Sequence, residues 1–106
     1  MDLEFLQDTI EAQLDKKPPG RRLRVTGQVK TLTTGWKVEL VKADPQGTNP
    51  DVIILEIKAQ APNGPSGDQV VTHDLTYRED PAQRDYTDAT IRYERLAFTI
   101  EVKVTH

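Results

Sequence analysis

The chain has 106 residues, which fits one domain with a single hydrophobic core and excludes a second domain. Hydrophobic residues make up 36% and charged residues 29% of it, and a mean hydropathy of -0.61 is typical of a folded protein with a wet surface. It contains no cysteine, which excludes disulfides and thiolate zinc sites, so packing and hydrogen bonding must supply its stability.

The net charge of -3 is unevenly distributed along the chain. Residues 1–17 carry five carboxylates and two lysines, residues 21–42 carry six basic residues against Glu39 alone, and the remainder is acidic. Such blocks bear on partners and solubility rather than on the fold. The start, M-D-L-E-F-L-Q-D, is acidic and interrupted by polar residues, so it is neither a secretory signal nor a membrane span. We therefore expect a cytoplasmic protein with no membrane partner.

The N-terminal segment is predicted to be an amphipathic helix over residues 2–16, forming a unit of residues 1–17 ahead of a β domain. Lys16 and Lys17 suit the end of a helix, and Pro18-Pro19-Gly20 stops it. Four apolar residues at helical spacing give it one apolar stripe: Leu3, Leu6, Ile10 and Leu14.

The other flanks of this predicted helix suggest an assembly surface. Four carboxylates repel one another along one flank: Glu4, Asp8, Glu11 and Asp15. Phe5, with Ala12, offers a second apolar face. We predict that the acidic flank meets the basic row of Arg22, Arg24 and Lys30 on a β-sheet, in the same chain or in a twofold-related copy. Phe5, Arg22, Arg24 and Lys30 are the predicted binding residues.

Beyond Gly20 the pattern changes from helical spacing to alternation, and six strands are predicted. They cover residues 22–30, 36–41, 51–61, 69–77, 86–93 and 96–105. The run 51–61 is the most apolar and is predicted to be the central strand. Cross-strand parity places Val29 opposite Val38 in a first hairpin and Ile91 opposite Phe98 in the last. Gly27 inside a strand indicates a bulge or a close approach by another group.

The predicted core follows from these registers. Its members are Ile53, Leu55, Ile57, Trp36, Val38, Phe98 and Ile100. One helix followed by six strands predicts an antiparallel β-sandwich over residues 18–106, with the helix packed on one sheet or one end, and a barrel is the alternative. The strand number and the position of Trp36 early in the second strand resemble immunoglobulin-like and fibronectin-type sandwiches. The paired cysteines of the immunoglobulin pattern are missing, so this resemblance implies a fold and no function.

Residues that could carry chemistry are few and scattered. Ser66 is the only serine and has no G-x-S-x-G setting. His73 is interpreted as a hydrogen-bonded core or interface residue. Two loop groups are interpreted as ordinary turn and surface residues, the first because its spacing is not that of a calcium loop: Asp44, Asn49 and Asp51, and Glu79, Asp80 and Asp85. We predict no catalytic residue, no metal site and no cofactor.

The charge balance also bears on partners. The basic cluster near Arg22 could contact phosphates, but a pI near 5.3 and the absence of a nucleic-acid motif argue against a nucleic-acid partner. The sequence favours a non-enzymatic interaction or assembly module whose partner is a second copy or another protein. The alternative is a small ligand-binding or hydrolytic β-domain that uses loop carboxylates.

Overall fold

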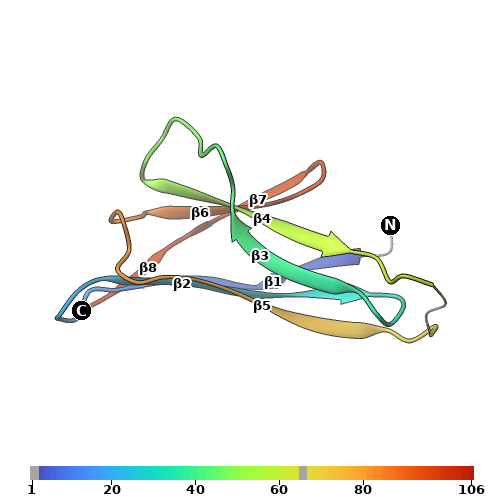
Figure 1. Cartoon of the computed structure of the whole chain (residues 1–106). Helices are drawn as coiled ribbons and strands as arrows, with labels where there is room; N and C mark the ends of the chain where they lie inside the picture. The colour runs from blue at the N-terminus through green and yellow to red at the C-terminus, as the bar shows by residue number, and fades with distance from the viewer. Residues whose placement is uncertain (1–2, 65–66) are drawn as a thin grey trace.

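A computed structural model describes residues 3–64 and 67–106 as eight strands in two sheets, with no helix among them (Figure 1). The first sheet has the order β5-β2-β1-β8, with β1 at Leu3–Asp15, β2 at Arg22–Thr31, β5 at Val71–Glu79 and β8 at Lys103–Thr105. The second has the order β3-β4-β6-β7, with β3 at Lys37–Lys42, β4 at Val52–Gln60, β6 at Asp88–Tyr93 and β7 at Leu96–Glu101. The mainly β class is confirmed, while six strands and an N-terminal helix were wrong.

The segment predicted as a helix is strand β1, which pairs antiparallel with β2. A register shift inside β1 explains the error. Leu6 faces Gln28 but Glu11 faces Thr26, so four residues of β1 lie opposite Gly27 alone. A net shift of three residues is odd and reverses the alternation of side chains between the two faces.

The first half of β1 therefore buries odd-numbered residues and the second half even-numbered residues. Leu3 is buried before the shift, and Ala12 and Leu14 are buried after it. Each half has period two, but the joined pattern spaces its apolar residues three to four apart, which imitates a helix.

The bulge in β1 is held by side-chain contacts. Thr9 Oγ1 donates to the Leu6 carbonyl at 2.6 Å and accepts from the Gln28 amide at 2.9 Å. The side chain of Ile10 lies over Gly27, where a Cβ would overlap with it. The prediction that Gly27 marks a bulge or a close approach is confirmed.

One predicted hairpin is confirmed and the other was wrong. β6 and β7 pair in the predicted register, with Ile91 opposite Phe98. The predicted pairing of Val29 with Val38 does not occur, because β2 pairs with β1 and β5, and β3 pairs with β4. Two pairings, β1 with β8 and β4 with β6, are parallel, so the sheets are not wholly antiparallel. The alternation of apolar residues indicates which side chains of a strand face inward, but it does not indicate which strand lies next to it.

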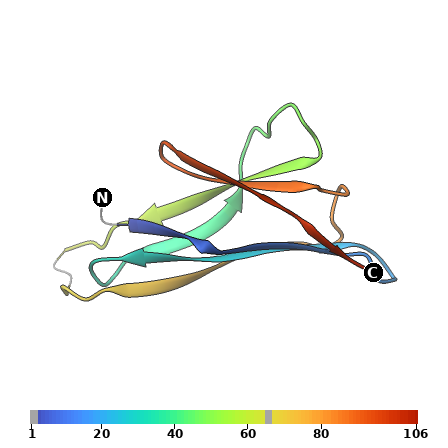
Figure 2. The same ribbon diagram turned by 180° about the vertical axis from the view of Figure 1, so that it is seen from behind.

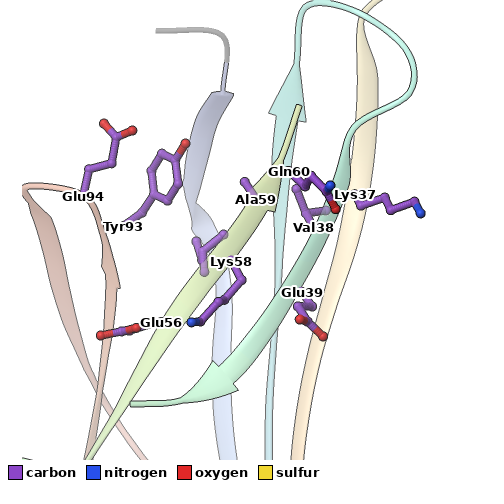
Figure 3. A pocket seen from close by; sticks show the side chains of 10 residues that line it. Lys37, Val38, Glu39, Glu56, Lys58, Ala59, Gln60, Tyr93 and Glu94 are labelled. Carbon is purple, nitrogen blue, oxygen red and sulfur yellow. The ribbon is translucent and has the colours of Figure 1, made fainter. Parts of the chain in front are cut away.

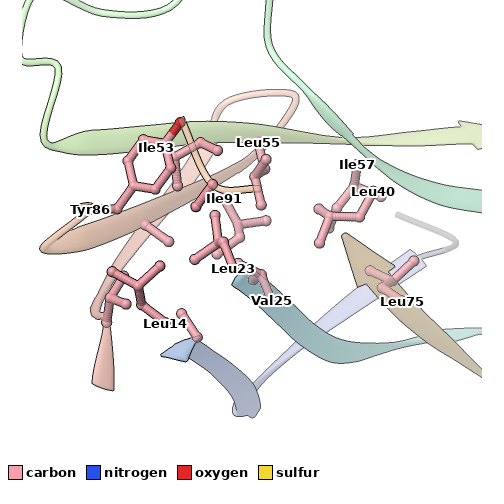
Figure 4. Packing of buried hydrophobic residues seen from close by; sticks show 14 of the residues in the cluster. Leu14, Leu23, Val25, Leu40, Ile53, Leu55, Ile57, Leu75, Tyr86 and Ile91 are labelled. Carbon is pink, nitrogen blue, oxygen red and sulfur yellow. The ribbon is translucent and has the colours of Figure 1, made fainter. Parts of the chain in front are cut away.

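The core lies between the two sheets (Figure 4). Ile53, Leu55 and Ile57 of β4 are buried as predicted. They belong to the same cluster as residues of the first sheet: Leu14, Leu23, Val25, Val29 and Leu75. β4 lies inside its sheet between β3 and β6, which confirms its central position there.

The outer members of the predicted core fall into two groups. All four are partly buried, but only Val38 and Ile100 pack against the cluster, to which Trp36 and Phe98 do not belong. Trp36 precedes β3 and donates from Nε1 to Thr33 Oγ1 at 2.9 Å. The residue on which the immunoglobulin-like resemblance depended is therefore a loop residue.

The last part of the chain joins the two sheets (Figure 2). β7 belongs to the second sheet and β8 to the first, and Val102 between them is buried. The Val102 amide donates to the Thr87 carbonyl at 2.8 Å, and the Lys16 amide donates to the Thr105 carbonyl at 2.8 Å. These bonds fix one lateral side of the molecule.

Candidate interaction site

Two of the predicted basic residues form ion pairs with the neighbouring strand. Arg22 Nη2 lies 2.9 Å from Asp15 Oδ2, and Lys30 Nζ lies 3.5 Å from Glu4 Oε2. Two carboxylates of β1 and two basic residues of β2 therefore meet within the chain, between paired strands. All four groups are partly solvated, so these pairs contribute little to stability.

The predicted binding role of Phe5 rested on a second apolar face, and that face is absent from β1. Phe5 is partly buried and its ring centroid lies 6.2 Å from that of Phe98. Ala12, its expected neighbour, is 2% exposed within the core. Arg24 is exposed and reaches only Gln13 Oε1, at 3.4 Å. Arg22, Arg24 and Lys30 lie on the outward face of β2, whereas Phe5 packs against the core, so the structure brings together the three basic residues but not Phe5.

Glu79 was interpreted as a surface carboxylate, and that was wrong. It is 9% exposed, and its Oε1 accepts from the Gln83 amide at 2.7 Å and from the Tyr86 hydroxyl at 2.8 Å. Oε2 accepts from the Tyr77 hydroxyl at 2.8 Å and lies 3.7 Å from Lys42 Nζ. Burial raises the pKa of Glu79, but the hydrogen bonds from Gln83, Tyr86 and Tyr77 outweigh burial and hold it below its ordinary value. This carboxylate holds the β5–β6 loop in place.

Arg21 holds the same loop from the opposite side. Its guanidinium donates to the carbonyls of Ala82 and Gln83 at 2.8 and 3.0 Å and to Asp85 Oδ1 at 3.0 Å. The hydrogen bond from Arg21 lowers the pKa of Asp85. Asp80 is exposed. The loop carboxylates with partners are thus engaged in holding the fold.

The remaining candidates are also explained locally. His73 Nε2 lies 3.0 Å from Oγ1 of the buried Thr31, which confirms the expected hydrogen bond. Asn49 Oδ1 accepts from the Asp51 amide at 3.0 Å, as turn residues do. Asp44 is exposed, and Ser66 lies outside the described residues. Within residues 3–64 and 67–106, no group of three or more His, Cys, Asp and Glu side chains could hold a metal ion.

A cleft of about 770 Å³ lies where β4 extends beyond β6 (Figure 3). Its apolar lining comes from Val38, Ile57, Ala59 and Tyr93, and its polar lining from Lys37, Glu39, Glu56, Lys58, Gln60 and Glu94. Figure 3 shows Tyr93, at the end of β6, and Glu94, in the turn that follows, on one side of β4 and the β3 residues on the other. Sequence reasoning missed this cleft.

The cleft exists because β6 ends early. Pairing between β4 and β6 runs from Val52 with Asp88 to Glu56 with Arg92, and the chain then turns back at Glu94, whose φ is 52°. β4 continues for four residues, Ile57 to Gln60, which pair only with β3. The side of these residues that would face a longer β6 faces the cleft instead.

The backbone directions along β4 follow from one hydrogen bond. The Ala43 amide donates to the Ile54 carbonyl at 2.9 Å, so the peptide groups of Ile54 face the β3 side. Successive strand residues alternate in the direction of their N–H and C=O groups. The backbone N–H and C=O of Lys58 therefore also point toward β3, while those of Ala59 point away from it. Ala59 therefore offers a strand donor and acceptor to the cleft.

Comparisons with known proteins add no family. No protein-family model, curated protein or solved structure matches this chain. The part of the chain that the structure describes includes no helix long and apolar enough to cross a membrane.

Proposed function

We propose that this protein is a non-enzymatic interaction module that holds a segment of a partner protein in the cleft beside β4. The observation that carries the proposal is the open side of Ile57–Gln60, where an apolar lining lies beside a strand edge that pairs with no described strand. Polar rims around an apolar floor are typical of protein-binding surfaces. The packing of the two sheets around one core further supports a β-sandwich as the scaffold.

The alternative, a ligand-binding or hydrolytic domain using loop carboxylates, has less support. A general acid or base needs a carboxylate that is reachable by substrate. Glu79 is surrounded by its own donors, and Asp85 is engaged by Arg21 and Lys16. The cleft beside β4 lies away from this loop and is lined by none of these residues.

The experiment is a selection of displayed random peptides of about 12 residues against the immobilised full chain, followed by affinity measurements on variants. A double charge reversal, Lys58→Glu with Glu94→Lys, changes both sides of the cleft. Leu32→Ser is the matched control, because Leu32 is 52% exposed and does not line the cleft. We expect the charge reversal to weaken binding about tenfold or more and Leu32→Ser to leave it unchanged. The proposed function would be refuted if the selection yielded no peptide. It would also be refuted if Leu32→Ser abolished peptide binding and the charge reversal did not.

A further inference from the structure

Resting on the proposed function, we infer that the bound segment is an extended strand of another protein that adds to the edge of β4 at Ile57–Gln60, in line with β6. Strand addition uses the main chain of the receptor for affinity and alternate side chains for selectivity. The structure supplies both at this position. The Ala59 backbone provides main-chain groups that point away from β3, and the cleft lining provides the side chains.

The main-chain part is the unpaired side of Ala59. Parallel pairing of β4 with β6 ends at Glu56, three residues before it. A strand in line with β6 would lie about 4.8 Å from β4, the ordinary spacing between paired strands. The Ala59 N–H and C=O would then each gain a partner that no described strand provides.

The side-chain part specifies the chemistry of the segment. Ile57 and Ala59 face inward and Lys58 faces outward, so residues of an added strand would alternate in the same way. Ala59 and Tyr93 are partly buried, pack against the core and line the cleft, so an inward residue of the added strand would meet apolar surface. The charged residues Lys58 and Glu94 are exposed at the cleft and of opposite sign, which favours polar residues beside them. The inferred ligand is a short extended segment with one apolar residue flanked by polar ones.

The site limits the length of its ligand. The turn at Glu94 blocks one end of the space beside β4, and β4 itself ends at Gln60. Only about four residues can pair there, which excludes a long strand and favours a terminal or loop segment.

The test uses the selected peptides and the position of one amide. Ala59→Pro removes the N–H that faces the cleft and leaves the residues that face β3 unchanged. Ala59→Ser keeps that N–H in a side chain of similar size and is the matched control. We expect Ala59→Pro to weaken peptide binding about tenfold or more, and Ala59→Ser to bind like the wild-type chain. Circular dichroism of each variant checks that it is folded.

Hydrogen exchange on the wild-type chain tests the inference without a substitution. Without peptide, the Ala59 amide should exchange faster than the Lys58 amide, which faces β3; with saturating peptide, the Ala59 amide should become protected. Peptides that are weakened by the charge reversal but leave Ala59 unprotected would overturn strand addition and leave the proposed function standing. Peptides insensitive to every cleft variant would refute both.

The same measurements decide whether the occupant is a second copy. We expect sedimentation of the wild-type chain at tens of micromolar to show no dimer that forms through the cleft. Any self-association should therefore be the same in the wild-type chain and in Ala59→Pro. A dimer lost in Ala59→Pro and retained in Ala59→Ser would overturn the assignment to another protein.

Discussion

Replacing Glu79 by glutamine tests whether a buried carboxylate holds the β5–β6 loop. In the wild-type chain three donors and Lys42 Nζ face its two oxygens. An amide keeps one oxygen, which can still accept from the Gln83 amide and Tyr86, but as a neutral group. Its NH₂ would take the place of Oε2, where the Tyr77 hydroxyl can rotate to accept from it, but Lys42 Nζ is a donor that it cannot satisfy.

The expected loss follows from these contacts. Two hydrogen bonds change from a charged to a neutral acceptor, at about 1 kcal/mol each, and the unfavourable contact with Lys42 adds about 1 kcal/mol, so Glu79→Gln should lower the free energy of unfolding by about 2–3 kcal/mol at pH 7. Urea unfolding followed by circular dichroism measures this value. Glu56→Gln is the control, because Glu56 forms a partly exposed ion pair with Arg92, and its loss should stay below about 1 kcal/mol.

The pH dependence gives a sharper test of the same contacts. The pKa of Glu79 lies below its ordinary value of 4.5 in the folded chain. A group of this kind stabilises the fold above its unfolded pKa, and its contribution disappears as the pH falls through the folded pKa. The difference between wild type and Glu79→Gln should therefore be largest at neutral pH and shrink below about pH 4.5. A difference that is constant with pH, or no larger than that of Glu56→Gln, would refute the assigned role.

Three other predictions concern the core, the bulge and the tyrosines. Leu55→Ala should lower the free energy of unfolding by about 2–5 kcal/mol, and a urea midpoint close to that of the wild type would contradict its burial. Gly27→Ala should cost about 1–3 kcal/mol through overlap with Ile10, and a double-mutant cycle with Ile10→Ala should recover part of it; additive losses would exclude this contact. Burial raises the pKa of Tyr77 and Tyr86, so the stability that they provide should be complete below about pH 10 and fall above it, and unfolding curves from pH 9 to 12 that stay flat would contradict their burial.

Local patterns predicted the second sheet better than the first. The β6–β7 hairpin is short, so the pairing of Ile91 with Phe98 was accessible from neighbouring sequence alone. β4 has uninterrupted period two, and its inward residues Ile53, Leu55 and Ile57 were assigned correctly. The pairing of β2 with β5 joins residues at least forty positions apart, as Thr31 with Val71, and no local signal specifies it.

The N-terminal strand shows how a single irregularity defeats periodicity. Neither half of β1 contradicts a strand, but the bulge between Leu6 and Glu11 merges two alternating patterns into one of helical appearance. The signal that could have revealed it was Gly27, which already indicated a bulge or a close neighbour. The prediction that the acidic row of this segment meets the basic row of β2 holds for two pairs, Asp15 with Arg22 and Glu4 with Lys30, because charge complementarity does not depend on the type of element.

The cleft could not be predicted, because it results from a difference in where two paired strands end. Strands were predicted at 51–61 and 86–93 but not beside each other, and their parallel pairing leaves Ile57–Gln60 without a neighbour on the β6 side. The only indication of the cleft was that the predicted strand 51–61 is longer than the predicted strand 86–93. Glu79 was missed for a similar reason, since its donors come from β5 and the following loop and become neighbours only after that loop closes.

An open strand edge is normally a risk, because it can pair with any other exposed edge. In this protein the exposed stretch of β4 is short, a turn closes one end of it, and Lys58 and Glu94 place charges beside it. These features disfavour indefinite edge-to-edge stacking. A long flat strand cannot enter the short space beside β4, and a wholly apolar strand would have to bury the charges of Lys58 and Glu94. They leave a short extended segment with polar flanks as the ligand that fits. The same features that protect the edge from aggregation therefore account for the selectivity proposed for the site.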